Sequence, residues 1–113
     1  TQAVPADVLQ FYRDYSAAML SHDMTRIMTF FSDRYLHEGR DKATRKLWME
    51  EWINDLSRLD ITITRFTPID DRRAYVEGRG DDNFVGFPIT PDTQIIKEDG
   101  QWKLLGNQKR YDR

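Results

Sequence analysis

The 113-residue sequence contains no cysteine. This absence excludes disulfide bonds, catalysis by a cysteine thiolate and zinc sites built from thiolates. No apolar run approaches the roughly 18 residues that a membrane-spanning helix needs, so we expect no membrane span. A chain of this length forms a core that removes roughly two-thirds of its unfolded surface from water without the help of disulfides. We therefore predict a single domain over residues 1–113.

An excess of charge of one sign is also missing. The 17 basic and 19 acidic residues are mixed along the chain and leave a formal net charge of −2. Such a surface has no field that would hold a nucleic acid or an anionic membrane. The histidines His22 and His37 lack the HExxH spacing of a zinc site, and residues 81–83 lack the glycine and glutamate of a calcium loop. We expect no metal, no cofactor and no nucleic-acid partner.

The sequence begins at Thr1, without a methionine. A shortened chain and a mature exported protein whose signal peptide has been removed both explain such a start. We favour a bacterial protein exported to the periplasm, with a cytoplasmic location as the alternative.

The N-terminal half has apolar residues at spacings of three and four, which predicts helices. Pro5 and Asp7 suit the first turn of the first helix. Asp23 can cap a second helix, and Asp41 a third, longer one that continues to about Leu56. Three helices are therefore expected before the middle of the chain.

After the third helix the apolar spacing changes to two, which is typical of half-buried strands. Residues 60–67 and 74–79 are predicted as strands, and residues 84–89 as a short, irregular strand that Pro88 confines to an edge. Residues 90–92 then lead into the clearest hairpin, TQIIKEDGQWKLLGN at 93–107, where Asp99-Gly100 supplies the turn. This order predicts an α+β fold in which three N-terminal helices pack on a curved, mostly antiparallel sheet of four to six strands.

Two segments resemble a known superfamily. YSAAMLSHDMTRIMTFFSDRYLHEGR, at 15–40, is similar to the entry of nuclear transport factor 2-like domains, which include ketosteroid isomerase and polyketide-cyclase-like proteins and share a cystatin-like fold. IIKEDGQWKLLGNQ, at 95–108, is similar to the final hairpin of the same group. The resemblance covers residues 8–108. It implies a cone that holds an apolar pocket, and a homodimer that forms through the sheet.

Trp48 and Trp52 lie one turn apart on the third predicted helix. Aromatic residues at helical spacing usually cover a sheet, and they also contact a ligand if the core contains a cavity. The first hypothesis is therefore a domain that binds a small apolar or aromatic molecule. The residues expected to contact that ligand are Tyr12, Tyr15, Phe31, Trp48 and Trp52.

The resemblance to ketosteroid isomerase also implies catalytic positions. Tyr15 stands eight residues before Asp23 and matches the tyrosine of that enzyme's oxyanion hole. Asp92 stands eight residues before Gly100 and matches the protonated aspartate that donates the second hydrogen bond. The position of the general base falls on Gly39.

His37 offers a substitute for the missing base. Alternation in the extended segment at 35–39 places His37 on the side of that base and Glu38 on the opposite side. The alternative hypothesis is an isomerase, dehydratase or cyclase with His37 as the base and Tyr15 and Asp92 as oxyanion donors. If Asp92 faces an apolar pocket, its pKa should lie well above the usual value of about 3.9. The structural alternatives are a hydrogen-bonded histidine, a tyrosine on a helix face and an aspartate in a turn.

A third hypothesis is an interaction module. In this case the outer face of the sheet, with Thr62, Thr64 and Tyr75, binds a second copy or another protein. The fold alone does not rank the three hypotheses.

Overall fold

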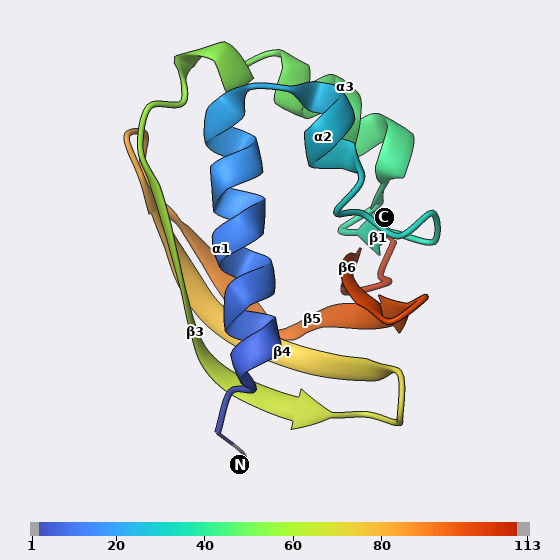
Figure 1. The fold of residues 1–113 in the computed structure, drawn as a ribbon. Helices are drawn as coiled ribbons and strands as arrows, with labels where there is room; N and C mark the ends of the chain where they lie inside the picture. The colour runs from blue at the N-terminus through green and yellow to red at the C-terminus, as the bar shows by residue number, and fades with distance from the viewer. Residues whose placement is uncertain (1–2, 111–113) are drawn as a thin grey trace.

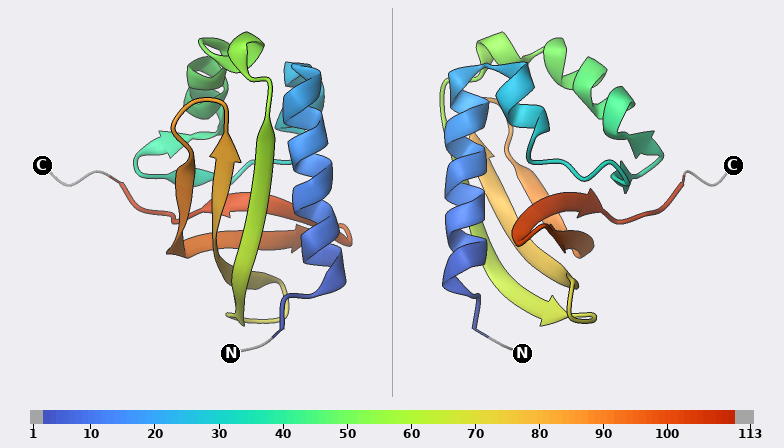
Figure 2. Two further views of the ribbon diagram at one scale, coloured as in Figure 1. Left: turned by 90° about the vertical axis from the view of Figure 1, so that its left-hand side faces the viewer. Right: turned by 45° about the vertical axis from the view of Figure 1, so that its right-hand side comes forward.

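The computed structural model describes residues 3–110. Within them, three helices pack on a curved and mostly antiparallel sheet, which confirms the predicted fold class (Figure 1). Figure 2 shows that α1 and α3 both lie on the concave face of the sheet. The elements are α1 (Ala6–Ser21), α2 (Met24–Met28), β1 (Leu36–His37), β2 (Arg40–Asp41), α3 (Lys42–Glu50), the short 3₁₀ helix η1 (Ile53–Asp55), β3 (Leu59–Pro68), β4 (Arg73–Asp82), β5 (Phe87–Glu98) and β6 (Gln101–Gly106).

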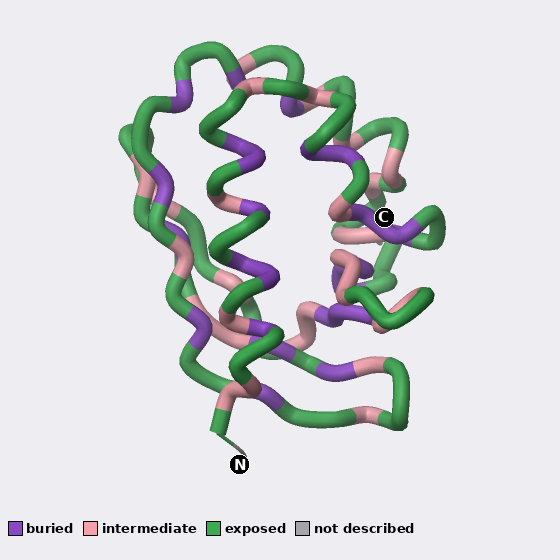
Figure 3. The backbone as a smooth tube through the Cα atoms, in the orientation of Figure 1, coloured by how far each residue is buried: buried purple, intermediate pink, exposed green. Residues whose placement is uncertain are grey.

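Helix α1 forms one wall of the interior. It ends at Ser21, and the next residue, His22, has a left-handed backbone (φ 62°) that turns the chain sharply toward α2. His22 Nε2 lies 2.7 Å from the Leu56 carbonyl oxygen. No helix among residues 3–110 combines the length and the apolar character needed to cross a membrane. The buried positions of α1 recur at spacings of three and four along one side (Figure 3): Val8, Phe11, Tyr12, Tyr15, Ala18 and Met19.

Both predicted aspartate caps are present. The Asp23 side chain accepts a hydrogen bond from the Arg26 amide at the start of α2, and the Asp41 side chain accepts one from the Thr44 amide at the start of α3. A capping carboxylate satisfies an amide that has no partner inside the helix, so these starts depend on local sequence alone.

Helix α3 ends at Glu50, earlier than the predicted end at Leu56. The residues that follow form η1, and the Asn83 side chain fixes the end of this segment. Asn83 Nδ2 donates to the Asp55 carbonyl oxygen at 2.9 Å, and Asn83 Oδ1 accepts from the Ser57 amide at 2.8 Å. The connection between β4 and β5 therefore fixes the backbone at the end of η1, beyond the end of α3.

The main sheet has the order β3-β4-β5-β6, with every neighbouring pair antiparallel. Each pair contains a register shift, and such bulges bend a strand and increase its twist. Gly78 lies at two of these shifts, where a side chain would collide with the Thr62 carbonyl oxygen. The bulges explain why the sheet curves around α1.

Strand β5 corrects the prediction of two separate segments, because residues 90–92 lie inside one strand of twelve residues. Val76 faces Thr93 and Gly78 faces Ile89, so β5 has two more residues than β4 between these pairs. Pro91, which lacks an amide hydrogen, is accommodated in this bulge. The predicted hairpin at 93–107 is confirmed, and Asp99 and Gly100 both have positive φ (52° and 77°), as a tight type I′ turn requires.

Candidate functional site

A cavity of about 610 Å³ lies between the helices and the concave face of the sheet. Residues 84–88, between β4 and β5, border it at the surface, and Val85 in this segment is 96% exposed. The rest of the wall is mainly apolar and aromatic. It includes Tyr12, Tyr15, Met19, Phe31, Tyr35, Trp48, Trp52, Leu56, Leu59, Ile61, Ile89 and Leu104.

All five residues predicted to contact a ligand line this cavity. Trp48 and Trp52 meet edge to face, with ring centroids 5.2 Å apart, and Trp52 meets Phe84 in the same way at 5.9 Å. Both tryptophans are half-buried and pack against the hydrophobic core. They therefore support the core with one surface and border the cavity with another.

Two arginines also line the cavity, and the sequence analysis did not select them. The guanidinium carbons of Arg40 and Arg45 each lie 4.8 Å from the centroid of the Trp48 ring. Arg45 precedes Trp48 by three residues, which places the two on one side of α3, and it precedes Trp52 by seven, a spacing that would put all three on one side of the longer helix predicted from the sequence. That spacing was the available signal in the sequence.

The tyrosine hydroxyls that border the cavity keep their protons at neutral pH. Burial raises the pKa of Tyr15, although the Arg45 guanidinium beside it opposes part of the rise. Burial likewise raises the pKa of Tyr35 and of Tyr12. The three phenols can therefore donate hydrogen bonds to a molecule in the cavity.

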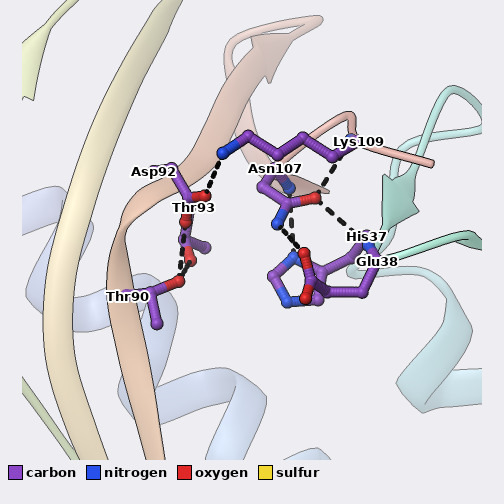
Figure 4. A network of polar contacts seen from close by, with 7 residues as sticks. All are labelled: His37, Glu38, Thr90, Asp92, Thr93, Asn107 and Lys109. Carbon is purple, nitrogen blue, oxygen red and sulfur yellow. Dashed lines mark hydrogen bonds and ion pairs between the residues drawn. The ribbon is translucent and has the colours of Figure 1, made fainter. Parts of the chain in front are cut away.

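His37 lines the cavity, and the backbone of Asn107, which directly follows β6, hydrogen-bonds its ring (Figure 4). The amide of Asn107 donates to His37 Nδ1 at 3.1 Å. Burial lowers the pKa of His37, and Arg45 lowers it further, so the ring is neutral at pH 7. With Nδ1 accepting, the proton of the neutral ring is on Nε2, which makes His37 a hydrogen-bond donor there. The predicted role of His37 as a base stays a prediction, and this geometry does not favour it.

Glu38 does not point away from the cavity, as strand alternation predicted, but borders it together with His37. Glu38 and Gly39 form the turn between β1 and β2, with φ values of 51° and 82°. Alternation therefore does not apply, because Glu38 lies in a turn and not in a strand. Its carboxylate accepts a hydrogen bond from Asn107 Nδ2 at 2.5 Å.

Asp92 is not among the residues that line the cavity, so the predicted catalytic trio is divided. Its carboxylate accepts hydrogen bonds from Lys109 Nζ at 2.9 Å and from the Thr90 hydroxyl at 2.7 Å (Figure 4). The bonds from Lys109 and Thr90 lower the pKa of Asp92. The condition for a raised pKa, that Asp92 faces an apolar pocket, is therefore not met, because Asp92 does not line the cavity and pairs with Lys109.

Other parts of the described chain contain weaker candidates for a binding site. A surface hollow of about 210 Å³ is lined mainly by charged residues, among them Arg34, Asp71 and Arg73, and Arg73 is already paired with Asp70. Residues 3–110 contain no cluster of three or more histidine, aspartate or glutamate side chains able to hold a metal ion. The large cavity is the best candidate site.

Comparisons of the sequence with protein-family models and with curated proteins find no match. Solved structures are similar to this one. An NTF2-like protein of unknown function from Shewanella oneidensis has a TM-score of 0.67 at 16% identity, over 88% of this chain and 93% of that one. A ketosteroid isomerase-like protein from Erwinia carotovora has a TM-score of 0.58 at 15% identity, over 89% and 90% of the two chains. A de novo designed protein with a curved β-sheet has a TM-score of 0.62 at 18% identity, over 88% and 91%.

These identities support a shared fold and do not establish a shared activity. One of the similar structures was designed de novo, which underlines that the likeness concerns the path of the chain. Another is described by its cystatin-like fold. This chain has the cone-shaped, cystatin-like fold of the NTF2-like proteins.

Proposed function

We propose that this protein binds a small, mostly apolar molecule in the cavity between α1, α3 and the sheet. The observation that carries the proposal is the cavity itself, whose volume of about 610 Å³ lies within the usual range for small-molecule sites. Its wall combines many apolar side chains with a few polar groups, which is the usual composition of such sites.

The aromatic wall favours a ligand that contains a ring. Phe31, Trp48 and Trp52 come from different segments and border one space. Aromatic rings attract one another in edge-to-face or offset-stacked arrangements, beyond the area they bury. A flat ring in the cavity would find such partners on several sides.

The segment at the surface of the cavity is also apolar. Phe84, Val85 and Phe87 are 45%, 96% and 39% exposed, and all three border the cavity. Exposed apolar residues gathered at one place often mark a binding site. Here they give an apolar ligand a route between solvent and the interior.

A substitution that fills the cavity tests this proposal. Ile61 lines the cavity, and its neighbour Thr62 is exposed, so Ile61→Trp should fill the space while Thr62→Trp leaves it open. The probe is N-phenyl-1-naphthylamine, an uncharged dye whose fluorescence rises in apolar surroundings. We expect the wild type and Thr62→Trp to bind the dye and folded Ile61→Trp to lose binding. Equal binding by all three, or none by the wild type, would contradict the proposal.

Proton transfer next to a carbonyl is a second candidate function, favoured by one observation. Glu38, a carboxylic acid, lines the same cavity as the donors Tyr15 and His37. In this reaction Glu38 removes a proton from the carbon beside the carbonyl, while the Tyr15 hydroxyl and His37 Nε2 donate hydrogen bonds to the enolate oxygen. Glu38 replaces His37 as the base because the backbone occupies His37 Nδ1.

Hydrogen–deuterium exchange of 2-tetralone, a bicyclic ketone, tests this candidate. We expect the wild type to accelerate exchange at the carbon beside the carbonyl, and Glu38→Gln to abolish the acceleration. His37→Asn should slow the exchange less, since it removes a donor and keeps the base. Exchange at the background rate with the wild type would exclude this activity for the ketone.

Pairing of two copies through the sheet is a separate proposal. Thr62, Thr64 and Tyr75 are exposed on the outer face, where Arg65 and Glu77 also form an ion pair at 3.7 Å. Such a polar face suits a dimer held by hydrogen bonds and ion pairs. Sedimentation equilibrium should show a dimer that Tyr75→Lys weakens and Leu47→Lys does not, since Leu47 is exposed on α3. A wild-type monomer at all concentrations would contradict the dimer.

A further inference from the structure

Most of the polar groups around the cavity are hydrogen-bond donors. Arg40 and Arg45 carry guanidinium groups, and the phenols of Tyr15 and Tyr35 keep their protons because burial raises their pKa. His37 presents the proton on Nε2, because its Nδ1 accepts from the backbone. A molecule that fits this set must supply acceptors.

The two carboxylates that border the cavity are already engaged by the protein. Glu38 accepts the hydrogen bond from the Asn107 side chain. Asp82 Oδ1 accepts from the Phe84 amide at 2.8 Å and from the Gly86 amide at 2.9 Å, which fixes the loop at the surface of the cavity. Within residues 3–110, neither of these carboxylates lies within 4.0 Å of a guanidinium nitrogen of Arg40 or Arg45, so neither forms an ion pair with them.

Arg45 has a hydrogen-bond donor for which the described part of the protein supplies no acceptor. Its Nε is buried and has no acceptor among the described residues. Within residues 3–110, no carboxylate lies within 4.0 Å of its guanidinium. A buried donor without an acceptor is unfavourable, and the guanidinium that carries this one is positively charged, so the site gains when an anion with acceptor oxygens enters. The Nε1 of Trp52 is also buried and also has no hydrogen-bond acceptor in the described part of the protein.

The placement of Arg45 fits a molecule with an anionic head and an aromatic body. Its guanidinium packs over the Trp48 ring, and Trp52, which follows just after α3, meets the Trp48 ring edge to face at 5.2 Å. A guanidinium binds a carboxylate through two parallel hydrogen bonds. With the carboxylate at Arg45, an attached ring would lie along Trp48 and Trp52.

We infer that the ligand of this cavity is a small aromatic carboxylate, and that Arg45 binds its carboxylate group. The inference rests on the proposed function, since it names the chemical class of the molecule that the cavity takes. Tyr15 and His37, which line the same cavity, are further donors for the acceptor groups of this molecule.

Calorimetric titration with two probes of equal shape tests the charge. The probes are 2-naphthoate, which is anionic at neutral pH, and 2-naphthamide, which is not charged. A hydrogen-bonded charge pair corresponds to a preference of about tenfold to a hundredfold. We expect the wild type to show this preference for 2-naphthoate, and Arg45→Met to remove it by weakening 2-naphthoate while 2-naphthamide binds as before. Lys46→Met, which removes a cation at the exposed neighbouring position, should keep the preference.

Each departure from this pattern has a distinct meaning. Equal binding of both probes by the wild type would refute the anionic ligand and leave the proposed function standing. A preference that persists in Arg45→Met, or that disappears in Lys46→Met, would refute Arg45 as the anchor. Decanoate that binds as tightly as 2-naphthoate would refute the aromatic body. Failure of all these probes and of N-phenyl-1-naphthylamine would refute the proposed function and this inference with it.

Discussion

Two groups of polar residues border the same cavity, and they differ in how far the protein satisfies them. At the end of β6, His37 and Glu38 each bind Asn107, and Asn107 Oδ1 also accepts from the Glu38 and Lys109 amides at 3.1 and 3.0 Å. On and just after α3, Arg45 Nε and Trp52 Nε1 are buried without an acceptor in the described chain.

The difference separates Asn107, which maintains the structure, from Arg45, which has a donor free for a ligand. A buried polar group with partners stabilises the fold, while one without partners destabilises it unless something else satisfies it. The network around Asn107 should therefore matter for stability, and Arg45 for binding. The following substitutions test this division, from the largest expected effect to the smallest.

Gly106→Ala should cause the largest loss of stability. Gly106 has φ 78°, and a side chain there would collide with the Leu36 carbonyl oxygen and lie 2.7 Å from His37 Cβ. We expect the free energy of unfolding to fall by more than about 2 kcal/mol in urea denaturation. Gly100→Ala is the control, because Gly100 has a similar φ of 77° but open space around it, and should lose about 1 kcal/mol. Equal losses would show that the β1–β6 contact is not tight.

Asn107→Ala should lower the free energy of unfolding by about 2 kcal/mol, because it removes the hydrogen bonds that this buried side chain forms with Glu38 and with the Lys109 amide. Urea denaturation measures this loss. Asn54→Ala, at an exposed position, should change the same quantity by less than about 0.5 kcal/mol. A loss at Asn107 as small as the loss at Asn54 would mean that the network does not stabilise the protein.

His37 should make stability depend on pH. Its pKa is lower in the folded protein than the unfolded value of about 6.5. Its contribution to stability is therefore present above about pH 6.5 and lost as the pH falls through the lowered folded pKa. Urea denaturation of wild type and His37→Asn should show a steeper loss on acidification in the wild type. Parallel curves would show that His37 titrates as it does in the unfolded chain.

Asp92→Asn should have the smallest effect. The ion pair with Lys109 is largely exposed, and exposed pairs contribute little. Binding of 2-naphthoate, measured by calorimetry, should be unchanged, because Asp92 does not line the cavity. Loss of 2-naphthoate binding in Asp92→Asn would show that Asp92 takes part in the binding site. Because the pKa of Asp92 is lower in the folded protein than in the unfolded chain, any stabilisation by Asp92 is present above about pH 3.9 and is lost on further acidification.

The sequence predicted those elements that local chemistry determines. The Asp99-Gly100 turn and the caps at Asp23 and Asp41 each depend on a few consecutive residues, and all three are confirmed. The position where η1 ends depends on Asn83, and the continuity of β5 on a bulge opposite β4. Contacts between distant segments decide both features, and no local pattern contains them.

The site shows the same division. The aromatic residues of the cavity were predictable because their spacing of three and four marks the inner face of a helix. Arg45 was missed because a charged residue in a helix usually faces water, although its spacing to Trp48 and Trp52 places it on the inner face. Glu38 was misplaced because the turn at Glu38-Gly39 interrupts the alternation of the strand.

The central claim is that Arg45 serves binding and Asn107 serves stability. The most direct test measures the free energy of unfolding and the affinity for 2-naphthoate in Arg45→Met and Asn107→Ala side by side. We predict that Arg45→Met keeps wild-type stability within about 1 kcal/mol, since it removes an unsatisfied donor along with the contact to Trp48, and weakens binding about tenfold or more. Asn107→Ala should lose stability and retain most of its affinity. An Arg45→Met protein that is much less stable yet binds 2-naphthoate as the wild type does would contradict the account.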